Sequence, residues 1–378
     1  MGSTRKMDPE KINKKIPHCK RDLYVVELFQ ILQKRYPCMS RGKSDKSRRT
    51  TPWTGREDIM TPAEKLTHYT FVQNYTDLHP PLGDSLEVGF INSHVPKACP
   101  YCHAEQFSMK GLDNNGIQRY RCNICGKRFK PTTGTIFDSR RIPLTEWVQY
   151  LLNLFHYVSI TADSWNNKNT FQTSSYWLKK VFLVLEGYQN DIVLGGKVWL
   201  DETYYSIVMR DRKRDSDGKL LRGISDNQLC IGVATDKTHT LCLFEGTSRP
   251  TQKRSLSTFN QHINPGSTLI HDKENTHKSL VRDLNLKSEE HDSKTLKGIP
   301  DSRNPLYPVN HTHFLLKSFL NAHSGFDRDN LSGYLNLFAF IMNPPDDYLE
   351  KVARILDLGF QNPKTLKYRD AFGVNSGK

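Results

Sequence analysis

Long apolar runs are missing from this chain. No stretch approaches the ~18 consecutive apolar residues that a transmembrane helix needs, so we expect neither a membrane span nor a membrane partner. The first residues also lack the apolar core of a secretory signal peptide, and we expect a cytoplasmic protein. Acidic residues are scarce beside basic ones, with 40 Asp and Glu against 54 Lys and Arg and a formal net charge of +14. This excess of positive charge favours a polyanionic partner such as nucleic acid. The alternative hypothesis is a basic protein of the translation apparatus.

Cysteine is also sparse, and half of it is gathered in one place. Four of the eight cysteines form two C-x-x-C pairs, Cys99 with Cys102 and Cys122 with Cys125, and nineteen residues separate the pairs. Two such knuckles supply the four thiolates of a tetrahedral Zn²⁺ site. We therefore predict a zinc ribbon over 96–132 and a reducing compartment, with two disulfides or chance pairs of cysteines as the alternative.

Basic and aromatic residues alternate around the second cysteine pair. Residues 118–121 lead into it as Gln-Arg-Tyr-Arg, and residues 126–130 follow it as Gly-Lys-Arg-Phe-Lys. Such a surface on a small rigid module suits the phosphate backbone of a nucleic acid. The ribbon residues that we predict to contact DNA are Arg119, Arg121, Lys127, Arg128 and Lys130.

The most basic part of the sequence precedes the ribbon. Residues 1–50 contain 14 Lys or Arg against 5 Asp or Glu. Apolar residues at helical spacing predict a helix near 23–32. We treat 1–95 as a basic, partly helical region and expect it to add phosphate contacts.

Two apolar stripes predict helices after the ribbon. The first begins after Pro143 and includes Trp147, and the second includes Trp177, with Thr173–Ser175 as its caps. This pattern over 133–192 is compatible with a helix-turn-helix whose second helix enters a DNA groove. A plain helical pair packed beneath the next domain is the alternative. The residues of the groove-reading hypothesis are Ser174 to Lys180, with Lys179 and Lys180 as DNA contacts.

From residue 196 the hydrophobic pattern changes to that of strands. A polar excursion over 209–227, with a turn at Asp217-Gly218, interrupts it. The order of strands and helices predicts a mixed α/β fold. The predicted strands are 197–200, 229–235, 240–244 and 268–270, and the predicted helices are 256–263, 309–322 and 328–342.

Two of the predicted strands end in an acidic residue, Asp201 and Asp272. Carboxylates just past adjacent buried strands can share divalent metal ions for two-metal phosphoryl transfer, and Mg²⁺ suits such a site. Taken alone, an aspartate at this position is more often a turn residue or a helix cap. Glu202 would point to the opposite face of the strand and is a weaker candidate.

These motifs together resemble a known family. The segment Val198–Tyr204, the His271-Asp272 pair, the cysteine ribbon and Thr133–Phe137 resemble the DDE insertion-sequence transposases with an N-terminal zinc ribbon, the ISXO-like group. The resemblance covers residues 97–343. It implies an α/β, ribonuclease H-like mixed-sheet catalytic core preceded by a zinc ribbon and a helix-turn-helix-like segment. Within that core, the resemblance implies Asp201 and Asp272 as the first two catalytic carboxylates.

The third catalytic position departs from the commonest pattern of that family. Members usually carry Glu on the last core helix and Lys seven residues later, and here Asn310 and Lys317 stand in that register. Seven residues are about two helical turns, so the two side chains share a face. The resemblance implies Asn310 as the third Mg²⁺ ligand, since parts of the family are Asp-Asp-Asn; His311 and His313 are alternative ligands, and a helix cap is the structural alternative. An amide brings no negative charge, so weaker metal binding or a preference for Mn²⁺ follows.

The resemblance therefore implies an insertion-sequence transposase that binds terminal inverted repeats and catalyses metal-dependent DNA cleavage and strand transfer. The implied cofactors are structural Zn²⁺ and catalytic Mg²⁺ or Mn²⁺. The implied partners are element-end and target DNA in the nucleoid and further copies of the chain, at least as a dimer, because two ends are paired. A zinc-ribbon DNA-binding protein with an inactive core and a ribonuclease H-like nuclease are the rival hypotheses. The expected domains are the N-terminal region 1–95, the ribbon 96–132, the helical segment 133–192, the core 193–345 and a C-terminal tail 346–378.

Overall fold

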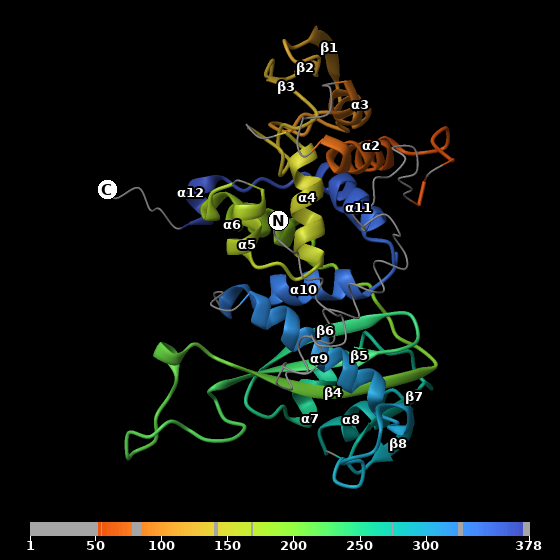
Figure 1. The fold of residues 1–378 in the computed structure, drawn as a ribbon, viewed down its shortest axis with the longest axis vertical. Helices are drawn as coiled ribbons and strands as arrows, with labels where there is room; N and C mark the ends of the chain where they lie inside the picture. Colours follow the sequence, from red (N-terminus) through yellow and green to blue (C-terminus); the bar gives the residue numbers. More distant parts are fainter. Residues whose placement is uncertain are drawn as a thin grey trace, which may run out of the picture. The chain divides into compact units, whose positions relative to one another are not determined.

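The chain divides into two compact units, 1–55 and 56–378, and the second contains every element discussed below (Figure 1). The basic segment 1–50 and its expected helix lie outside the described residues. Within the described part of the chain, no helix is long and apolar enough to cross a membrane. The computed structural model describes residues 52–53, 55–77, 85–139, 143–167, 169–273, 275–323 and 328–372.

The secondary structure comprises a small sheet, a large sheet and helices around both. The described helices are α2 (Pro62–Asp77), α3 (Ser85–Ser93), α4 (Thr145–Phe155), α5 (Ile160–Asn166), α6 (Phe171–Val184), α7 (Gln252–Phe259), α8 (Lys278–Asp283), α9 (Tyr307–Ala322), α10 (Leu331–Met342), α11 (Tyr348–Gln361) and α12 (Tyr368–Ala371). The described strands are β1 (Phe107–Leu112), β2 (Gln118–Cys122), β3 (Arg128–Phe129), β4 (Lys197–Ser206), β5 (Gln228–Thr235), β6 (Thr240–Thr247), β7 (Thr268–Asp272) and β8 (Lys287–His291).

A five-stranded sheet with the order β6-β5-β4-β7-β8 organises the second half of the chain. Strand β5 pairs antiparallel with both β4 and β6, whereas β4 pairs parallel with β7, and β7 pairs parallel with β8. Helices α7 and α8 lie in the two connections that lead into the parallel strands. This mixed α/β topology is consistent with the ribonuclease H-like core that the sequence predicts. Strand β8 was not predicted from the sequence, because it is polar and carries no apolar run.

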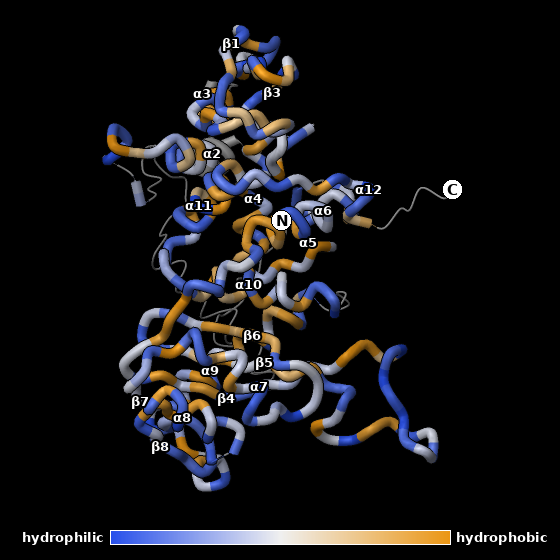
Figure 2. The backbone as a smooth tube through the Cα atoms, turned by 180° about the vertical axis from the view of Figure 1, so that it is seen from behind, coloured by the Kyte–Doolittle hydropathy of each residue, from blue (hydrophilic) through white to orange (hydrophobic). Residues whose placement is uncertain are grey.

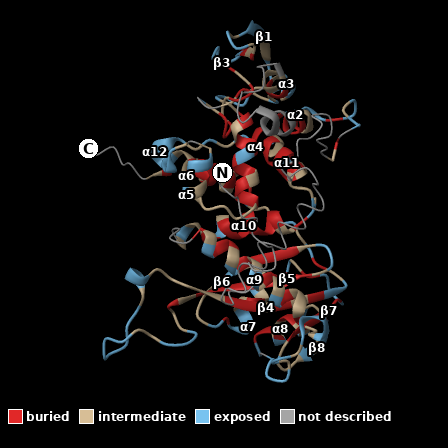
Figure 3. Ribbon diagram, viewed as in Figure 1, coloured by how far each residue is buried: buried red, intermediate tan, exposed pale blue. Residues whose placement is uncertain are grey.

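Strand β5 is the most deeply buried element of the sheet. All but the first of its residues are buried, because strands lie on both its sides and both of its faces are covered (Figure 3). A strand in that environment carries a continuous apolar run instead of an alternating pattern. Cys230 and Cys242 are buried on β5 and β6. The strands predicted over 229–235 and 240–244 are present, and they pair as a hairpin across Asp236-Lys237.

Helices lie on both faces of the sheet. Helix α9 packs against β4 and β5 on one face, and α7 and α8 pack on the other (Figure 1). An apolar core fills the space between these two helices and their face of the sheet. Its buried members are Leu194, Val198, Leu200, Ala234, Leu241, Phe259, Ile263, Leu269, Leu280 and Leu286.

A second group of helices packs around aromatic rings. Trp147 of α4 stacks on Trp177 of α6 with ring centroids 4.7 Å apart. Phe137 contacts the ring of Phe360 on α11, with centroids 4.8 Å apart. The apolar stretches of α4, α10 and α11 are visible as orange segments in Figure 2. Helix α11 is buried along one side, so the segment expected as a tail contains a packed helix.

The predicted helices on either side of residue 160 are present, but their connection differs from the expectation. An additional helix, α5, lies between them and is capped by Ser159, whose hydroxyl accepts the amide of Ala162. Helix α6 is capped by Thr170, whose hydroxyl accepts the amide of Thr173. The cap therefore lies before the residues predicted for it, because an N-cap hydroxyl bonds the amide two or three positions later.

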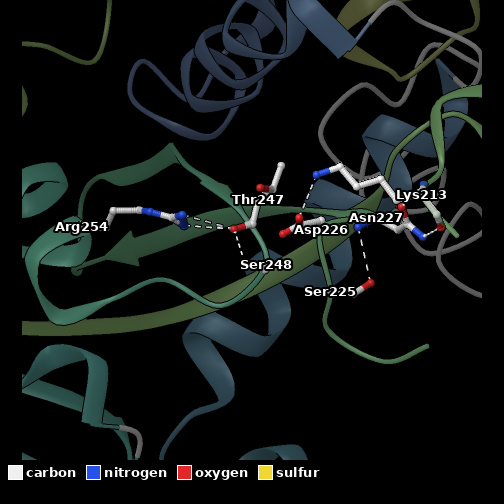
Figure 4. A network of polar contacts seen from close by, with 7 residues as sticks. All are labelled: Lys213, Ser225, Asp226, Asn227, Thr247, Ser248 and Arg254. Atoms are coloured by element: carbon white, nitrogen blue, oxygen red, sulfur yellow. Dashed lines mark hydrogen bonds and ion pairs between the residues drawn. The ribbon is translucent and has the colours of Figure 1, made fainter. Parts of the chain in front are cut away.

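The polar excursion between β4 and β5 leaves the sheet as a long loop, drawn in green in Figure 1. Its base is closed by side chains, as Figure 4 shows: Lys213 Nζ lies 2.9 Å from the Asp226 carboxylate, and the Asn227 amide donates to the Lys213 carbonyl at 2.8 Å. Nearby, Arg254 of α7 donates to the carbonyl of Thr247 at the end of β6, at 3.0 Å. These contacts fix where the excursion leaves and rejoins the sheet.

The packing of α11 is testable at Gly359. A Cβ there would lie 2.6 Å from the ring of Phe137, in a fully buried contact. Alanine gains up to about 1 kcal/mol in helix propensity over glycine. Overpacking a core costs about 1–3 kcal/mol, so the steric cost wins. We expect Gly359→Ala to lower the free energy of unfolding in chemical denaturation.

Gly89 on α3 provides the matched control, because a Cβ there meets nothing within 4 Å. Gly89→Ala keeps the propensity gain without the clash, so we expect it to raise the unfolding free energy. Equal stabilisation by both substitutions would contradict the packing of α11 against Phe137.

Candidate functional site

The aspartates at the ends of β4 and β7 are brought together by strand register. Trp199 of β4 is paired with Ile270 of the parallel strand β7. Asp201 and Asp272 each follow two residues later, so both belong to the same face of the sheet at neighbouring strand ends. The two aspartates therefore lie side by side because the chain crosses over through α7 and makes β7 parallel to β4.

Burial and like charge act together on Asp201. Burial, then the charges of Asp272 and Glu202, raise the pKa of the Asp201 carboxyl to about 7. The amide of Glu202 donates to Asp201 Oδ1 at 2.9 Å and opposes this shift. Carboxylates held close in this way bind a proton or a cation more readily than separated ones. The arrangement is therefore suited to a hard divalent ion.

A cavity of about 320 Å³ opens over these carboxylates and includes Asn310 in its lining. Asn310 lies in the first turn of α9, is exposed, and comes to the cavity because α9 packs against β4. The structure therefore gathers three of the predicted site residues around one space. The complete lining is Asp201, Asp272, Ser293, Lys294, Leu296, Lys297, Asn304, Leu306 and Asn310.

Two lysines in this lining were missed by the sequence reasoning. Lys294 and Lys297 are exposed residues of the loop between β8 and α9. Asp292 holds that loop, since its carboxylate accepts the Lys294 amide at 2.9 Å. The Lys-x-x-Lys spacing was a usable signal, but β8 had not been predicted and the loop had no assigned place.

The remaining predicted residues of α9 lie along the same helix. Lys317 is exposed and is not part of the cavity lining. His313 lies between it and Asn310, and its Nε2 is 3.3 Å from the Asp201 carbonyl oxygen. Burial lowers the pKa of His313 to about 4, so its ring is neutral near pH 7. His311 stacks on Tyr307 of its own helix, with ring centroids 5.4 Å apart.

The opposite face of the sheet holds a second buried polar group. Glu202 points away from Asp201, as its strand position predicts, and its carboxylate lies 3.0 Å from His277 Nε2. Despite burial, the hydrogen bond and charge of His277 lower the pKa of Glu202. Glu245 on β6 is also buried, and burial followed by the charge of Glu202 raises its pKa to about 8. Acidic groups therefore gather on both faces of β4.

The four cysteines of the two knuckles form one compact cluster. Their Sγ atoms all lie within 4.8 Å of one another. Cys99 and Cys125 are 3.7 Å apart, and Cys102 and Cys122 are 3.5 Å apart. Zn–S bonds of about 2.3 Å at tetrahedral angles place sulfurs about 3.8 Å apart, so the cluster fits a metal ion such as zinc. Separations of this size exclude the predicted alternative of two disulfides, which need about 2.05 Å.

The strands β1, β2 and β3 form the three-stranded sheet that carries this cluster. Backbone amides of Ile124 and Cys125 each donate to Cys122 Sγ at 3.4 Å. These amides lower the pKa of the Cys122 thiol, which favours the thiolate form that metals bind. Beneath the sulfurs, Tyr120 and Phe129 are the main apolar members of a small core. A core this small is typical of domains that a metal stabilises.

The ribbon also presents a basic face. Arg121 of β2 is paired with Arg128 of β3, and both are exposed. Lys127 is exposed beside them, with its ammonium 4.8 Å from the Tyr101 ring centroid. Lys130 instead forms an ion pair with Asp113, and Arg119 is half-buried. Arg121, Lys127 and Arg128 are therefore the predicted ribbon contacts that are both exposed and without a carboxylate partner in the described part of the chain.

The lysines predicted to read a DNA groove occupy a different environment. Lys180 is buried, and its ammonium donates to the Ile136 carbonyl, while burial lowers its pKa to about 8. Lys179 donates to the Ala371 carbonyl, and Ser174 is fully buried. This arrangement matches the alternative prediction, in which the two helices form a plain packed pair. The sequence pattern did not show that α12 and residues 132–139 would cover the face of α6 that carries the lysines.

A second cavity, of about 480 Å³, lies at the base of the polar excursion. Its basic lining is a further anion-compatible surface that sequence reasoning did not single out, because its members are close only after the loop folds back. These basic residues are Arg212, Arg214, Lys219 and Arg222.

Comparisons with known proteins add little to this geometry. No family model matches the sequence, and no curated protein matches it. Among solved structures, a chain from the crystal structure of a pre-cleavage Mos1 transpososome is similar at 10% identity and a TM-score of 0.24, covering 95% of this chain and 91% of that one. At this TM-score the similarity bears on neither the fold nor the function.

The cysteine cluster predicts that metal holds the ribbon together. We expect the purified protein to contain a thiolate-bound Zn²⁺ ion, and Cys122→Ser to lose it because a tetrahedral site then lacks a ligand. Replacement by Co²⁺ gives thiolate charge-transfer absorption that reports this site. Cys230→Ala, which removes a core thiol, is the control and should keep that absorption. Retention of the absorption in Cys122→Ser would contradict the assignment.

Proposed function

We propose that this protein is a DNA transposase of an insertion sequence, with an Asp-Asp-Asn catalytic site. The observation that carries the proposal is the cavity lined jointly by Asp201, Asp272 and Asn310, two from neighbouring parallel strands and one from the helix across them. Oxygen donors of this kind match Mg²⁺ or Mn²⁺. The residues present therefore fit the ions that the resemblance implies.

The proposed reaction has two phosphoryl transfers. Water attacks the phosphodiester at an element end and the 3′-hydroxyl leaves; that hydroxyl then attacks a target phosphodiester, and a target 3′-hydroxyl leaves. The divalent ions, when bound, supply the charge that activates the nucleophile and stabilises the leaving oxygen. The two aspartates supply negative oxygen ligands held rigidly by β4 and β7. His313, neutral near pH 7, borders Asp201 without neutralising it.

The basic residues beside this cavity would position the DNA. Lys294 and Lys297 line the cavity, and Lys317 is exposed farther along α9. An ammonium contributes phosphate affinity without reading sequence. In this proposal the three lysines hold the scissile strand, while the terminal inverted repeats bind elsewhere on the protein.

The ribbon is the proposed site for those terminal repeats. Arg121, Lys127 and Arg128 form its exposed basic face on one rigid sheet. Residues 133–192 would support the ribbon as a packed helical segment and 193–345 would form the catalytic core. Pairing of two element ends calls for at least two copies of the chain, and two-fold symmetry is the simplest such assembly.

The test is cleavage of a DNA duplex that carries the inverted repeats bordering the protein's own coding sequence. With Mg²⁺ or Mn²⁺ we expect nicking at the repeat ends, lost at least 100-fold (about 2.7 kcal/mol) in Asp201→Asn, because a charged metal ligand becomes neutral. Asparagine keeps the shape and relieves repulsion by Asp272, so DNA binding and thermal stability should be retained.

Asp283→Asn is the control, since Asp283 is an exposed carboxylate paired with Arg282 and remote from the cavity lining. It should cleave like the wild type. End binding without cleavage under either metal would replace the proposal by a DNA-binding protein with an inactive core, for which Asn310 is the favouring observation. Cleavage without joining to target DNA would indicate a nuclease.

Asn310 predicts an unusual metal requirement. Because its amide brings no charge, we expect half-maximal cleavage at a several-fold higher Mg²⁺ concentration than in Asn310→Asp, with Mn²⁺ more effective for the wild type. The added carboxylate is also favoured in the first turn of a helix. Asn321→Asp, near the far end of α9, is the matched control and should leave the titration unchanged. Identical titrations for wild type and Asn310→Asp would exclude Asn310 as a ligand.

A further inference from the structure

Two buried histidines face each other on the side of the sheet opposite α9. His271 ends the buried part of β7, and His277 follows six residues later in the short turn of helix at Asn275–His277. Both are buried, at 1% and 0% exposure. Their Nδ1 atoms are 3.4 Å apart and their rings are nearly perpendicular, at 86°.

The outer nitrogens of both rings already have partners. His277 Nε2 lies 3.0 Å from the Glu202 carboxylate, which can only accept, so Nε2 carries the hydrogen. His271 Nε2 lies 3.0 Å from the Ser288 hydroxyl, which can accept in the same way. In that arrangement neither Nδ1 atom carries a hydrogen, so two lone pairs lie on atoms 3.4 Å apart. A histidine that binds a metal through one ring nitrogen commonly donates the N–H of the other nitrogen to a carboxylate, as His277 does here.

A third donor lies beside this pair. One carboxylate oxygen of Asp272 and the ligating nitrogens of His271 and His277 all lie within 4.8 Å of one another. A carboxylate has two oxygens and can serve two ions, so Asp272 can face this group and still line the cavity beside Asp201.

We propose that His271, His277 and Asp272 bind a divalent transition-metal ion, with Zn²⁺ as the first candidate. Metal–nitrogen bonds of about 2.0–2.1 Å at tetrahedral angles place two nitrogens about 3.3–3.4 Å apart, which matches the observed separation. A hydrogen bond between the same atoms prefers about 2.7–3.2 Å. Two imidazoles favour zinc, iron, nickel or copper over Mg²⁺, so this ion differs from those proposed for the catalytic cavity.

The electrostatic surroundings favour a cation at this position. Glu202 and Glu245 are both buried on this face, and both carboxylate oxygens of Glu245 lack a hydrogen-bond partner among the described residues. Besides the His277 ring, Arg254 is the basic group of the described residues whose charge acts on Glu245. A divalent ion on His277 would add positive charge where buried acids outnumber their counter-ions.

The site does not depend on the proposed transposase activity, and its test reads metal binding alone. The full-length protein is loaded with Zn²⁺, passed through a desalting column and analysed for zinc per chain. We expect one equivalent beyond the ion held by the four cysteines. With Co²⁺ we expect absorption from a nitrogen and oxygen site in addition to the thiolate charge-transfer bands of the ribbon.

Variants assign the second ion. His271→Gln should lose it while keeping the ribbon ion, because one imidazole ligand is gone. Glu202→Gln should weaken binding of the second ion by about 10–100-fold, the usual effect of losing a carboxylate that supports a metal-binding histidine. His323→Gln is the matched control, since His323 is also buried but lies at the end of α9 outside the cluster. Circular dichroism establishes that each variant is folded.

Zinc bound only at the ribbon in the folded wild type would overturn the proposal and leave a proton shared between the two Nδ1 atoms. Retention of the second ion in folded His271→Gln would also overturn it. If His271→Gln fails to fold, Glu202→Gln decides, because weaker Co²⁺ binding with unchanged ribbon bands is expected from the proposal alone. Loss of cleavage in Asp201→Asn has no bearing on this outcome, since Asp201 is not one of the three ligands.

Discussion

The alternation of side chains along β4 is the constraint on which the rest of the site depends. Consecutive residues of a strand face opposite sides of its sheet, so Asp201 and Glu202 send one carboxylate to each face. Because β4 is central and its faces are covered, Glu202 is buried and Asp201 is half-buried. On one face Asp201 lies beside Asp272 at the cavity next to α9, and on the other face Glu202 contacts His277. A single pair of adjacent acids thereby creates two chemically distinct environments.

Ligand chemistry separates the metal sites that these environments can support. The ribbon offers four sulfurs, the cavity offers oxygens, and the buried pair His271 and His277 offers nitrogens. Soft thiolates select zinc, oxygens select Mg²⁺ or Mn²⁺, and imidazoles select transition ions. Asp272 stands between the last two sites, so its orientation links the faces of the sheet. This division would keep a structural ion apart from the proposed catalytic ions.

Local patterns in the sequence were sufficient for much of the fold. The cysteine spacing indicated the compact sulfur cluster, and strand runs followed by acids indicated β4, β7 and the aspartates at their ends. Segments without a local signature were missed: β8 is polar, and α11 lies in a region expected as a tail. The face of α6 was also misjudged. Lys180 became buried because the Ile136 carbonyl provides a partner for its ammonium, which no local pattern reveals.

The sequence by itself determined the donor atoms of this protein: four thiolates at fixed spacing, aspartates after apolar runs, and an asparagine seven residues before a lysine on one helix face. These are short-range properties, because spacing and periodicity act within a few turns or strands. The tertiary structure alone decided which donors meet. The parallel pairing of β4 with β7 brings Asp201 beside Asp272, and the packing of α9 brings Asn310 to both. On the opposite face, the turn after β7 sets His277 against His271, and both rings are buried because that face of the sheet is covered.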